Sequence, residues 1–438
     1  MTSILGAKPA HIGQGLAGVL LAAVLAGSAH AAVKIPLWHS LQGHNADVLQ
    51  DLVRSWNRSQ SDVDVSLRQF DTPEALDQAL NQAAGAKKLP ALAQIGNTHT
   101  LDHIAKRPYV QPFHLLQGQA AFKGADWFLA TDNAFVHDAK GRLMAFPYML
   151  EIPVMYYNQA AFQKAGLTPT EPARIWIDLQ GQLVALANKG SRTCPLTSNL
   201  PVSINLENLA AVNNQFYAGA DNGLTAKGLP SFSFNSTYVR HLSLMISWVR
   251  SEIMTRPDAG LRAVSRFAEG ECAVLMSDSG HIGEFDAQRK LQFAVSGLPY
   301  YPEVTRKPGN PFVNGSALWV MKSDKAVTDA TVTFLGWLAK PEQAARWYQE
   351  TGYLPLTKAA FNQTPENYYR HLGAWRDLVA PYAQKSAVTA QGFRINNYPA
   401  IRSRFQQIID TALDGQEPAV TALSTAAAEG NRLVRQAE

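Results

Sequence analysis

The residues around one tyrosine near the carboxyl end of the chain are suited to binding a polar ligand. An amphipathic pattern ends at Thr351-Gly352, and Gly352 suits the left-handed backbone position that commonly terminates a helix. Pro355 prevents the old helix from continuing, so we expect Tyr353 on a rigid corner where its phenol can face a cleft. A phenol donates and accepts hydrogen bonds, although a buried tyrosine can instead bond to nearby backbone. The segment therefore predicts either a ligand contact or a self-satisfied core tyrosine at position 353.

Other patterns that could carry catalytic or metal chemistry are incomplete. His99 and His103 flank Asp102 with a spacing that could hold a metal on one helix face, but no third ligand stands at a compatible place. The sequence contains neither G-x-S-x-G nor H-E-x-x-H, so two specific hydrolase motifs are missing. We therefore expect a protein that is not an enzyme and has no metal or cofactor. A carboxylate pair among the 35 acidic residues keeps a secreted hydrolase as the alternative of another class.

The amino-terminal segment has the order of a secretory signal peptide. Lys8 precedes an apolar run over residues 16–26, and residues 28–31 end in an A-x-A-like site, so we predict a signal peptide over residues 1–31. The run is shorter than the about 18 to 20 residues of a membrane span, and no lipobox cysteine follows it. The G-x-G-x-x-G match at 13–18 follows no strand, so it does not indicate a nucleotide site. The predicted location of the mature chain is the periplasm.

Composition limits the partners and the number of cores. The formal net charge of the 438 residues is +4, and removal of residues 1–31 takes away one lysine and no acid. This mild and dispersed charge does not predict nucleic-acid binding. The length supports two to three domain-sized cores. Cys194 and Cys272 would lie in an oxidising compartment, where either a disulfide or two buried thiols is compatible with the sequence.

The first hundred residues alternate between strand and helix patterns. The segments are 35–38, 45–56, 63–67, 73–84 and 90–95. This β-α-β-α-β order predicts an α/β lobe with a mainly parallel sheet, and Asn45 is a candidate cap of the first helix. Ligands of such sheets bind beyond the carboxyl ends of the strands, and Asn97 follows the third strand.

A second set of elements begins near Met144. Its strands are expected at 152–157 and 272–276, with a helix within 172–190, while an apolar strand returns at 317–321. No Ser-rich or Gly-rich linker separates two halves, so we expect two lobes that exchange chain more than once. The predicted division gives lobe 1 residues 32–145 plus 305–350, and lobe 2 residues 146–304 plus 351–438.

Several short segments of the chain share a family pattern. They are Ile35-Pro-Leu-Trp-His-Ser40, Pro153-Val-Met-Tyr-Tyr-Asn158, Gly270-Glu-Cys-Ala273, Gly315-Ser-Ala-Leu-Trp-Val-Met321, Lys340-Pro-Glu342 and Thr351-Gly-Tyr-Leu-Pro355. Together they resemble the periplasmic sn-glycerol-3-phosphate-binding proteins, the solute-binding subunits of ABC importers in extracellular solute-binding protein family 1. The resemblance implies two α/β lobes, a hinge and an interlobe ligand cleft. It also implies a monomer that delivers a small solute to two inner-membrane permease subunits and a cytoplasmic ATPase.

The ligand residues that the resemblance implies match only in part. Gly315, Tyr353 and Arg402 match the family, and a backbone N–H, a phenol and a guanidinium can together hold an anion. The family has serines where this chain has Glu151 and Asp278. A carboxylate facing a phosphate is repulsive unless it is protonated or paired.

The remaining ligand positions also depart from the family. Asn97 replaces the family's cleft acid, Pro73 its cleft tyrosine, and 197–201 its tryptophan-bearing loop, while Ser279 lies beside Asp278. The expected ligand is glycerol-3-phosphate or a related glycerophosphodiester, with a polyol or sugar as the alternative. Two further readings stay open: Glu151 could pair with Arg402, and strand-end acids can simply cap loops.

Overall fold

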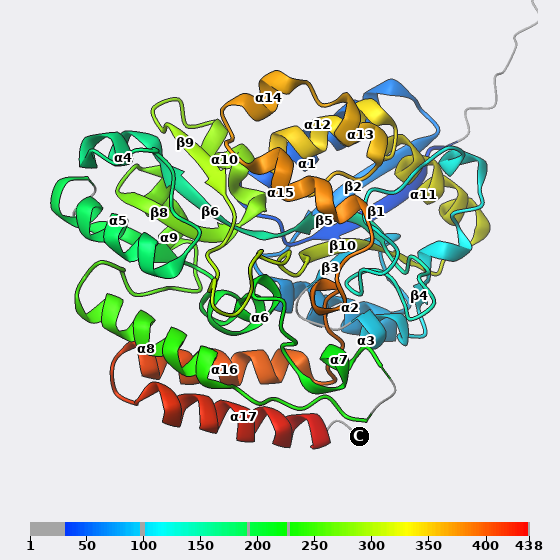
Figure 1. Cartoon of the computed structure of the whole chain (residues 1–438). Helices are drawn as coiled ribbons and strands as arrows, with labels where there is room; N and C mark the ends of the chain where they lie inside the picture. The colour runs from blue at the N-terminus through cyan, green and yellow to red at the C-terminus, as the bar shows by residue number, and fades with distance from the viewer. Residues whose placement is uncertain (1–30, 97–100, 191–192, 226–227, 437–438) are drawn as a thin grey trace, which may run out of the picture.

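The computed structural model describes residues 31–96, 101–190, 193–225 and 228–436, which form two β-sheets with helices packed around them (Figure 1). Apart from Ala31, the predicted signal peptide lies outside the described residues, as do Asn97 and His99. None of the helices in these ranges combines the length and the apolar character needed to cross a membrane. The buried apolar residues form two clusters, of which one includes the first sheet and part of the second, and the other includes the rest of the second sheet and the helices around it. The predicted two-lobed α/β class is confirmed.

The first sheet has six strands and mixed direction. Its strands are β2 (Val63–Gln69), β1 (Val33–His39), β3 (Leu92–Gly96), β10 (Asn314–Met321), β4 (Val110–Gln111) and β5 (Phe146–Glu151). β1 runs parallel to β2 and β3, as predicted. β10 runs antiparallel to β3, and its other edge is antiparallel to β4 and β5. The expectation of a mainly parallel sheet is therefore correct for the first three strands and wrong for the rest.

The second sheet has four strands in the order β7-β8-β6-β9. They are β7 (Cys194–Ser198), β8 (Cys272–Asp278), β6 (Pro153–Asn158) and β9 (Phe293–Ser296). β6 and β9 are buried along their whole length, which explains why their sequences lack polar alternation.

Local sequence signals explain where many helices begin and end. Thr72 accepts a hydrogen bond from the Ala75 N–H (3.1 Å) and Pro73 occupies the first turn of α2 (Pro73–Ala86). Gly352 ends α12 (Pro341–Thr351) at φ +84°, as predicted. Besides α2 and α12, the α-helices before β5 and between β10 and residue 380 are α1 (Gly43–Ser59), α3 (Leu101–Ala105), α11 (Lys325–Leu338), α13 (Lys358–Gln363), α14 (Glu366–Arg370) and α15 (Trp375–Val379).

The remaining helices accompany the second sheet. α8, α16 and α17 lie side by side at one end of the molecule (Figure 1). This group and the shorter helices are α4 (Gln159–Ala165), α5 (Trp176–Lys189), α6 (Asn208–Val212), α7 (Gly219–Gly223), α8 (Ser236–Arg250), α9 (Arg262–Ala268), α10 (Ile282–Asp286), α16 (Tyr398–Leu413) and α17 (Ala419–Gln436).

The chain passes between the two sheets at Ile152. β5 pairs with β10 in the first sheet, whereas β6 begins one residue later and pairs with β8 and β9 in the second. The predicted division placed residues 146–151 in the second lobe, and the pairing of β5 leads us to propose Ile152 as the crossing instead. Leu356, Trp375 and Tyr382 belong to the larger hydrophobic cluster, which includes residues of both sheets, and Val295 of β9 hydrogen-bonds to Leu372 and Ala374, so packing assigns α13–α15 to neither lobe alone. The other boundaries stay a prediction.

One predicted cap is wrong. α1 begins at Gly43, two residues before Asn45, and its Ncap Gln42 makes no side-chain cap. The Asn45 amide instead donates to the Gly280 carbonyl (2.8 Å), in the turn that follows β8. Asn45 therefore links α1 to the second sheet region rather than closing its own helix.

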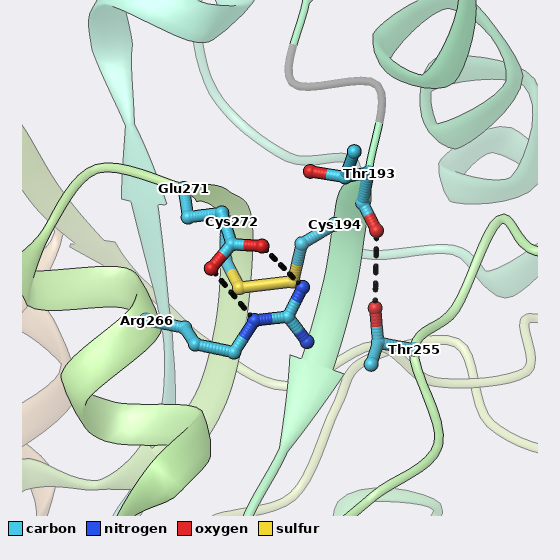
Figure 2. The surroundings of a disulfide bond; sticks show 6 residues. All are labelled: Thr193, Cys194, Thr255, Arg266, Glu271 and Cys272. Carbon is cyan, nitrogen blue, oxygen red and sulfur yellow. Dashed lines mark hydrogen bonds and ion pairs between the residues drawn. A yellow bond between two sulfur atoms is a disulfide. The ribbon is translucent and has the colours of Figure 1, made fainter.

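Cys194 and Cys272 form a disulfide at the start of two paired strands (Figure 2). The two residues are direct partners in the parallel β7–β8 register, with Cα atoms 4.5 Å apart and both side chains fully buried. Arg266 of α9 binds Glu271 beside the bridge (Nη2–Oε1 2.6 Å). Of the two cysteine states compatible with the sequence, the structure contains the bonded one.

Candidate functional site

A cleft of about 490 Å³ lies beyond the carboxyl end of β3, between the first sheet and α16. Four of the predicted ligand residues line it: Glu151, Gly315, Tyr353 and Arg402. Its size is within the range of small-molecule sites, about 300–1,000 Å³. The two sides come from segments far apart in the sequence, so the fold alone assembles this group.

Backbone requirements explain the glycine at position 315. Gly315 has φ +92°, and a Cβ there would lie 2.4 Å from the Met149 carbonyl oxygen and 3.0 Å from Glu151 Cγ. Gly280 also lies close to Glu151, because a Cβ added at position 280 would be 2.5 Å from Glu151 Oε2. The two glycines therefore make room for the Glu151 side chain where β5 ends.

The carboxyl group of Glu151 is poorly solvated. Burial raises its pKa well above the ordinary value, the Asp278 carboxylate raises it further, and a hydrogen bond from the Gly280 N–H acts in the opposite direction. Among the described residues Glu151 forms no ion pair. The predicted alternative that Glu151 pairs with Arg402 is therefore wrong.

Asp278 and Ser279 are not among the residues that line this cleft. Asp278 Oδ1 accepts a hydrogen bond from the Asn314 amide (2.8 Å), and burial raises the pKa of this carboxyl group. Ser279 is fully buried, and its Oγ accepts from the Ile152 N–H (3.3 Å). Ser279 thus anchors the crossing between the sheets, whereas Asp278 is partly exposed and its contact with a ligand stays a prediction.

Tyr353 stands on the predicted corner with most of its ring packed. Its ring stacks on Trp347 (centroids 5.5 Å apart, planes at 20°), and Trp347 stacks on Tyr148 at 4.5 Å. Only 6% of Tyr353 is exposed, and burial raises the pKa of its phenol, so it stays protonated. The ring of Tyr353 thus packs in the core while the residue also lines the cleft, and its contact with a ligand stays a prediction.

Arg402 is already paired inside the protein. Its Nε lies 3.0 Å from Glu207 Oε1, and this carboxylate raises the pKa of Arg402 above its ordinary value. The Tyr398 hydroxyl donates to the same carboxylate oxygen, and Tyr217 contacts the Tyr398 hydroxyl at 3.0 Å. The side chain of Arg402 is 34% exposed and that of Glu207 is 9% exposed, so the cation faces the cleft and its counter-ion lies behind it.

Sequence reasoning missed Glu207 altogether. It lies in a π-helical turn, Ser203–Glu207, within a run of buried residues whose polar members have no periodic pattern. No described group of three or more His, Cys, Asp or Glu residues could hold a metal ion, and half of the predicted histidine pair, His99, lies outside the described residues. Glu207 is recognised as a site residue by its contact with Arg402, which is 195 residues away in the sequence and close only in the folded protein.

Comparison with known proteins agrees with this architecture. Residues 51–371 match the family described as bacterial extracellular solute-binding protein. The sn-glycerol-3-phosphate-binding periplasmic protein UgpB of Shigella dysenteriae is 29% identical over 98% of this chain and 99% of its own length, and that of Escherichia coli K12 is 28% identical with the same coverage.

Solved structures show the same fold at lower identity. UgpB from Mycobacterium tuberculosis in complex with glycerophosphocholine has a TM-score of 0.73 at 18% identity, covering 92% of this chain and 99% of that one. Maltose-bound T. maritima MalE3 has a TM-score of 0.72 at 17% identity, covering 92% and 100%. The predicted resemblance and periplasmic location are confirmed, and the chain belongs to the bacterial extracellular solute-binding proteins.

Proposed function

We propose that this protein is the solute-binding component of an ABC importer and captures a glycerophosphodiester with a cationic head group. Solute-binding proteins of such importers close around a ligand and present it to membrane partners. The partners of this chain would be two inner-membrane permease subunits and a cytoplasmic ATPase. The protein would act as a monomer that binds its solute without chemical change.

The charge balance of the cleft is the observation that carries the proposal. Among the described lining residues Arg402 is the sole lysine or arginine, and Glu207 already neutralises it. Glu74 and Glu151 are the acids on the same lining, and neither forms an ion pair with a described residue. The cleft thus has an excess of carboxyl groups over available cationic charge.

This balance favours a diester over a monoester. A phosphate monoester carries about −1.5 to −2 charges at neutral pH, whereas a diester carries one and can bring a compensating cation. A cationic head group could pair with Glu74 and would favour the ionised form of Glu151, whose pKa burial raises, and the hydroxyl groups of glycerol could bond to Tyr353 and to backbone. Glycerol-3-phosphate itself would therefore be the weaker ligand.

The ligands of related proteins support a glycerophosphate ligand and also allow a sugar. The curated relatives are sn-glycerol-3-phosphate-binding proteins, and one solved structure of the same fold holds glycerophosphocholine. Another holds maltose, and a neutralised Arg402–Glu207 pair can also donate to sugar or polyol hydroxyls. A polyol or sugar is therefore the second candidate.

Calorimetry with the mature protein tests the proposal. The panel is glycerophosphocholine, glycerophosphoethanolamine, glycerol-3-phosphate, maltose and free glycerol, with product analysis after each titration. We expect saturable one-to-one binding of at least one cationic diester, at least ten-fold tighter than glycerol-3-phosphate, with the ligand recovered intact. Tighter binding of maltose or glycerol would favour the second candidate, and turnover of any compound would indicate a hydrolase.

A further inference from the structure

Glu207 is a buried carboxylate that binds the guanidinium of the cleft from behind. Its Oε1 lies 3.0 Å from Arg402 Nε and accepts the Tyr398 hydroxyl as well. Tyr398 and Arg402 are one turn apart at the start of α16, so the two donors converge on one oxygen. The contact therefore joins two elements of the second lobe before any ligand enters.

The segment that carries Glu207 is rigidly held. The Asn205 amide donates to the Pro201 carbonyl (2.6 Å), and its oxygen lies 3.0 Å from His241 Nε2. Asn208, the next residue after Glu207, donates to Ser203 Oγ (2.8 Å) and accepts from the Phe312 N–H (2.7 Å). Glu207 is flanked by buried residues, and its contacts with the Tyr398 hydroxyl and Arg402 Nε hold its carboxylate at the guanidinium.

Glu207 leaves part of Arg402 available. It occupies the Nε position, and no described residue bonds to either Nη atom. Arg402 lines both the cleft and a second cavity of about 90 Å³, which Glu207 also lines. Arg402 can thus donate hydrogen bonds to a ligand, while the pair as a whole carries no net charge.

We propose that Glu207 is a specificity-determining residue that excludes phosphate dianions by neutralising Arg402 from behind. The identity of the preferred ligand rests on the proposed function, but the exclusion of dianions is a property of the pair. A dianion at Arg402 would meet a fixed carboxylate within the same ion pair, whereas a monoanionic diester or a hydroxyl would meet less repulsion. The family resemblance implied a role for Arg402 and none for Glu207.

The test compares Glu207→Gln with the parent protein. Glutamine keeps the shape, and its carbonyl oxygen can still accept from Tyr398 and Arg402, while the negative charge is removed. We expect glycerol-3-phosphate and inorganic phosphate to bind at least ten-fold more tightly to the variant in calorimetry. Binding of glycerophosphocholine should change less than three-fold, so that the preference for the diester over the monoester decreases or is reversed in the variant.

Glu74→Gln is the matched control. Glu74 lines the same cleft, is exposed and has no ion pair with Arg402, so this change removes an equal charge without touching the pair, and solvent screening should limit its gain for phosphate to less than three-fold. A ten-fold gain for phosphate in Glu74→Gln as well would show a general charge effect and overturn the proposal. The double variant Glu207→Gln with Arg402→Gln should lose the gain.

Two further measurements keep the proposal refutable. If Glu207→Gln does not fold, as judged by circular dichroism, Glu207→Asp retains a carboxylate but shortens its reach, and we expect a smaller phosphate gain in the same direction. Unchanged phosphate binding in a folded Glu207→Gln or Glu207→Asp protein would overturn the role of Glu207. Failure of the parent to bind any diester would instead overturn the proposed function, while the phosphate comparison would still decide the role of Glu207.

Discussion

Replacing Gly315 with alanine should destabilise the protein and disturb the cleft. Gly315 has φ +92° and pairs with Leu150 across the β10–β5 ladder. The new Cβ would lie 2.4 Å from the Met149 carbonyl oxygen and 3.0 Å from Glu151 Cγ. A carbonyl oxygen of a paired strand cannot rotate away as a side chain can, so β10 and β5 must separate locally.

The magnitude follows from two costs. A left-handed backbone costs a non-glycine residue about 1–2 kcal/mol, and overpacking of a buried position costs about 1–3 kcal/mol. Their sum places the expected loss in the free energy of unfolding at about 2–5 kcal/mol. Because Glu151 is one of the two contacts, ligand affinity should also fall, by about ten-fold or more for a shift near 1 Å.

Urea unfolding followed by tryptophan fluorescence is the assay, with Gly181→Ala as the matched control. Gly181 is exposed within α5, and a Cβ there would meet no atom within 4 Å. Alanine in an exposed helix should stabilise by about 0.5–1 kcal/mol, so the two alanine variants should shift in opposite directions. A Gly315→Ala protein as stable as the parent would refute the close packing of β10 against β5.

Three further predictions concern the buried acids and the disulfide. The pKa of Glu151 is raised in the folded protein. Its contribution to folding stability is therefore complete below the unfolded-state pKa near 4.5, and it is lost as pH rises through the folded-state pKa. Glu151→Gln should therefore raise the melting temperature relative to the parent at pH 8 and lose this advantage near pH 4; a pH-independent difference would contradict the reasoning. Replacing Glu151 and Asp278 together with serine should improve glycerol-3-phosphate binding by about 1–3 kcal/mol in calorimetry, and no improvement would mean that these acids do not set the charge preference. Replacing Cys194 and Cys272 together with alanine should lower the free energy of unfolding by about 2–5 kcal/mol in urea titrations, and parent-like stability would show that the bridge contributes little.

Local signals in the sequence predicted much of the fold. Gly352 had to end a helix in the left-handed region, and the structure has it there at φ +84°. The alternation of apolar residues likewise predicted β2 and α2 near their observed bounds, because both features depend on neighbours in the chain. The direction of β10 had no such signal, since an apolar strand looks the same in either orientation.

At the candidate site, too, some features were predicted from the sequence and others depend on the tertiary structure. The sequence predicted a secreted, two-lobed protein, and its family resemblance predicted that Glu151, Gly315, Tyr353 and Arg402 lie at one cleft, which all four line. Only the tertiary structure decided that Ser279 is buried and does not line that cleft, and that Arg402 pairs with Glu207 rather than with Glu151. The physical reason is range: periodicity and helix ends arise from contacts within a few residues, whereas a counter-ion is chosen by the folding of segments that are 195 residues apart. Charge preference in the cleft depends on that choice, so it could not be read from residue types alone.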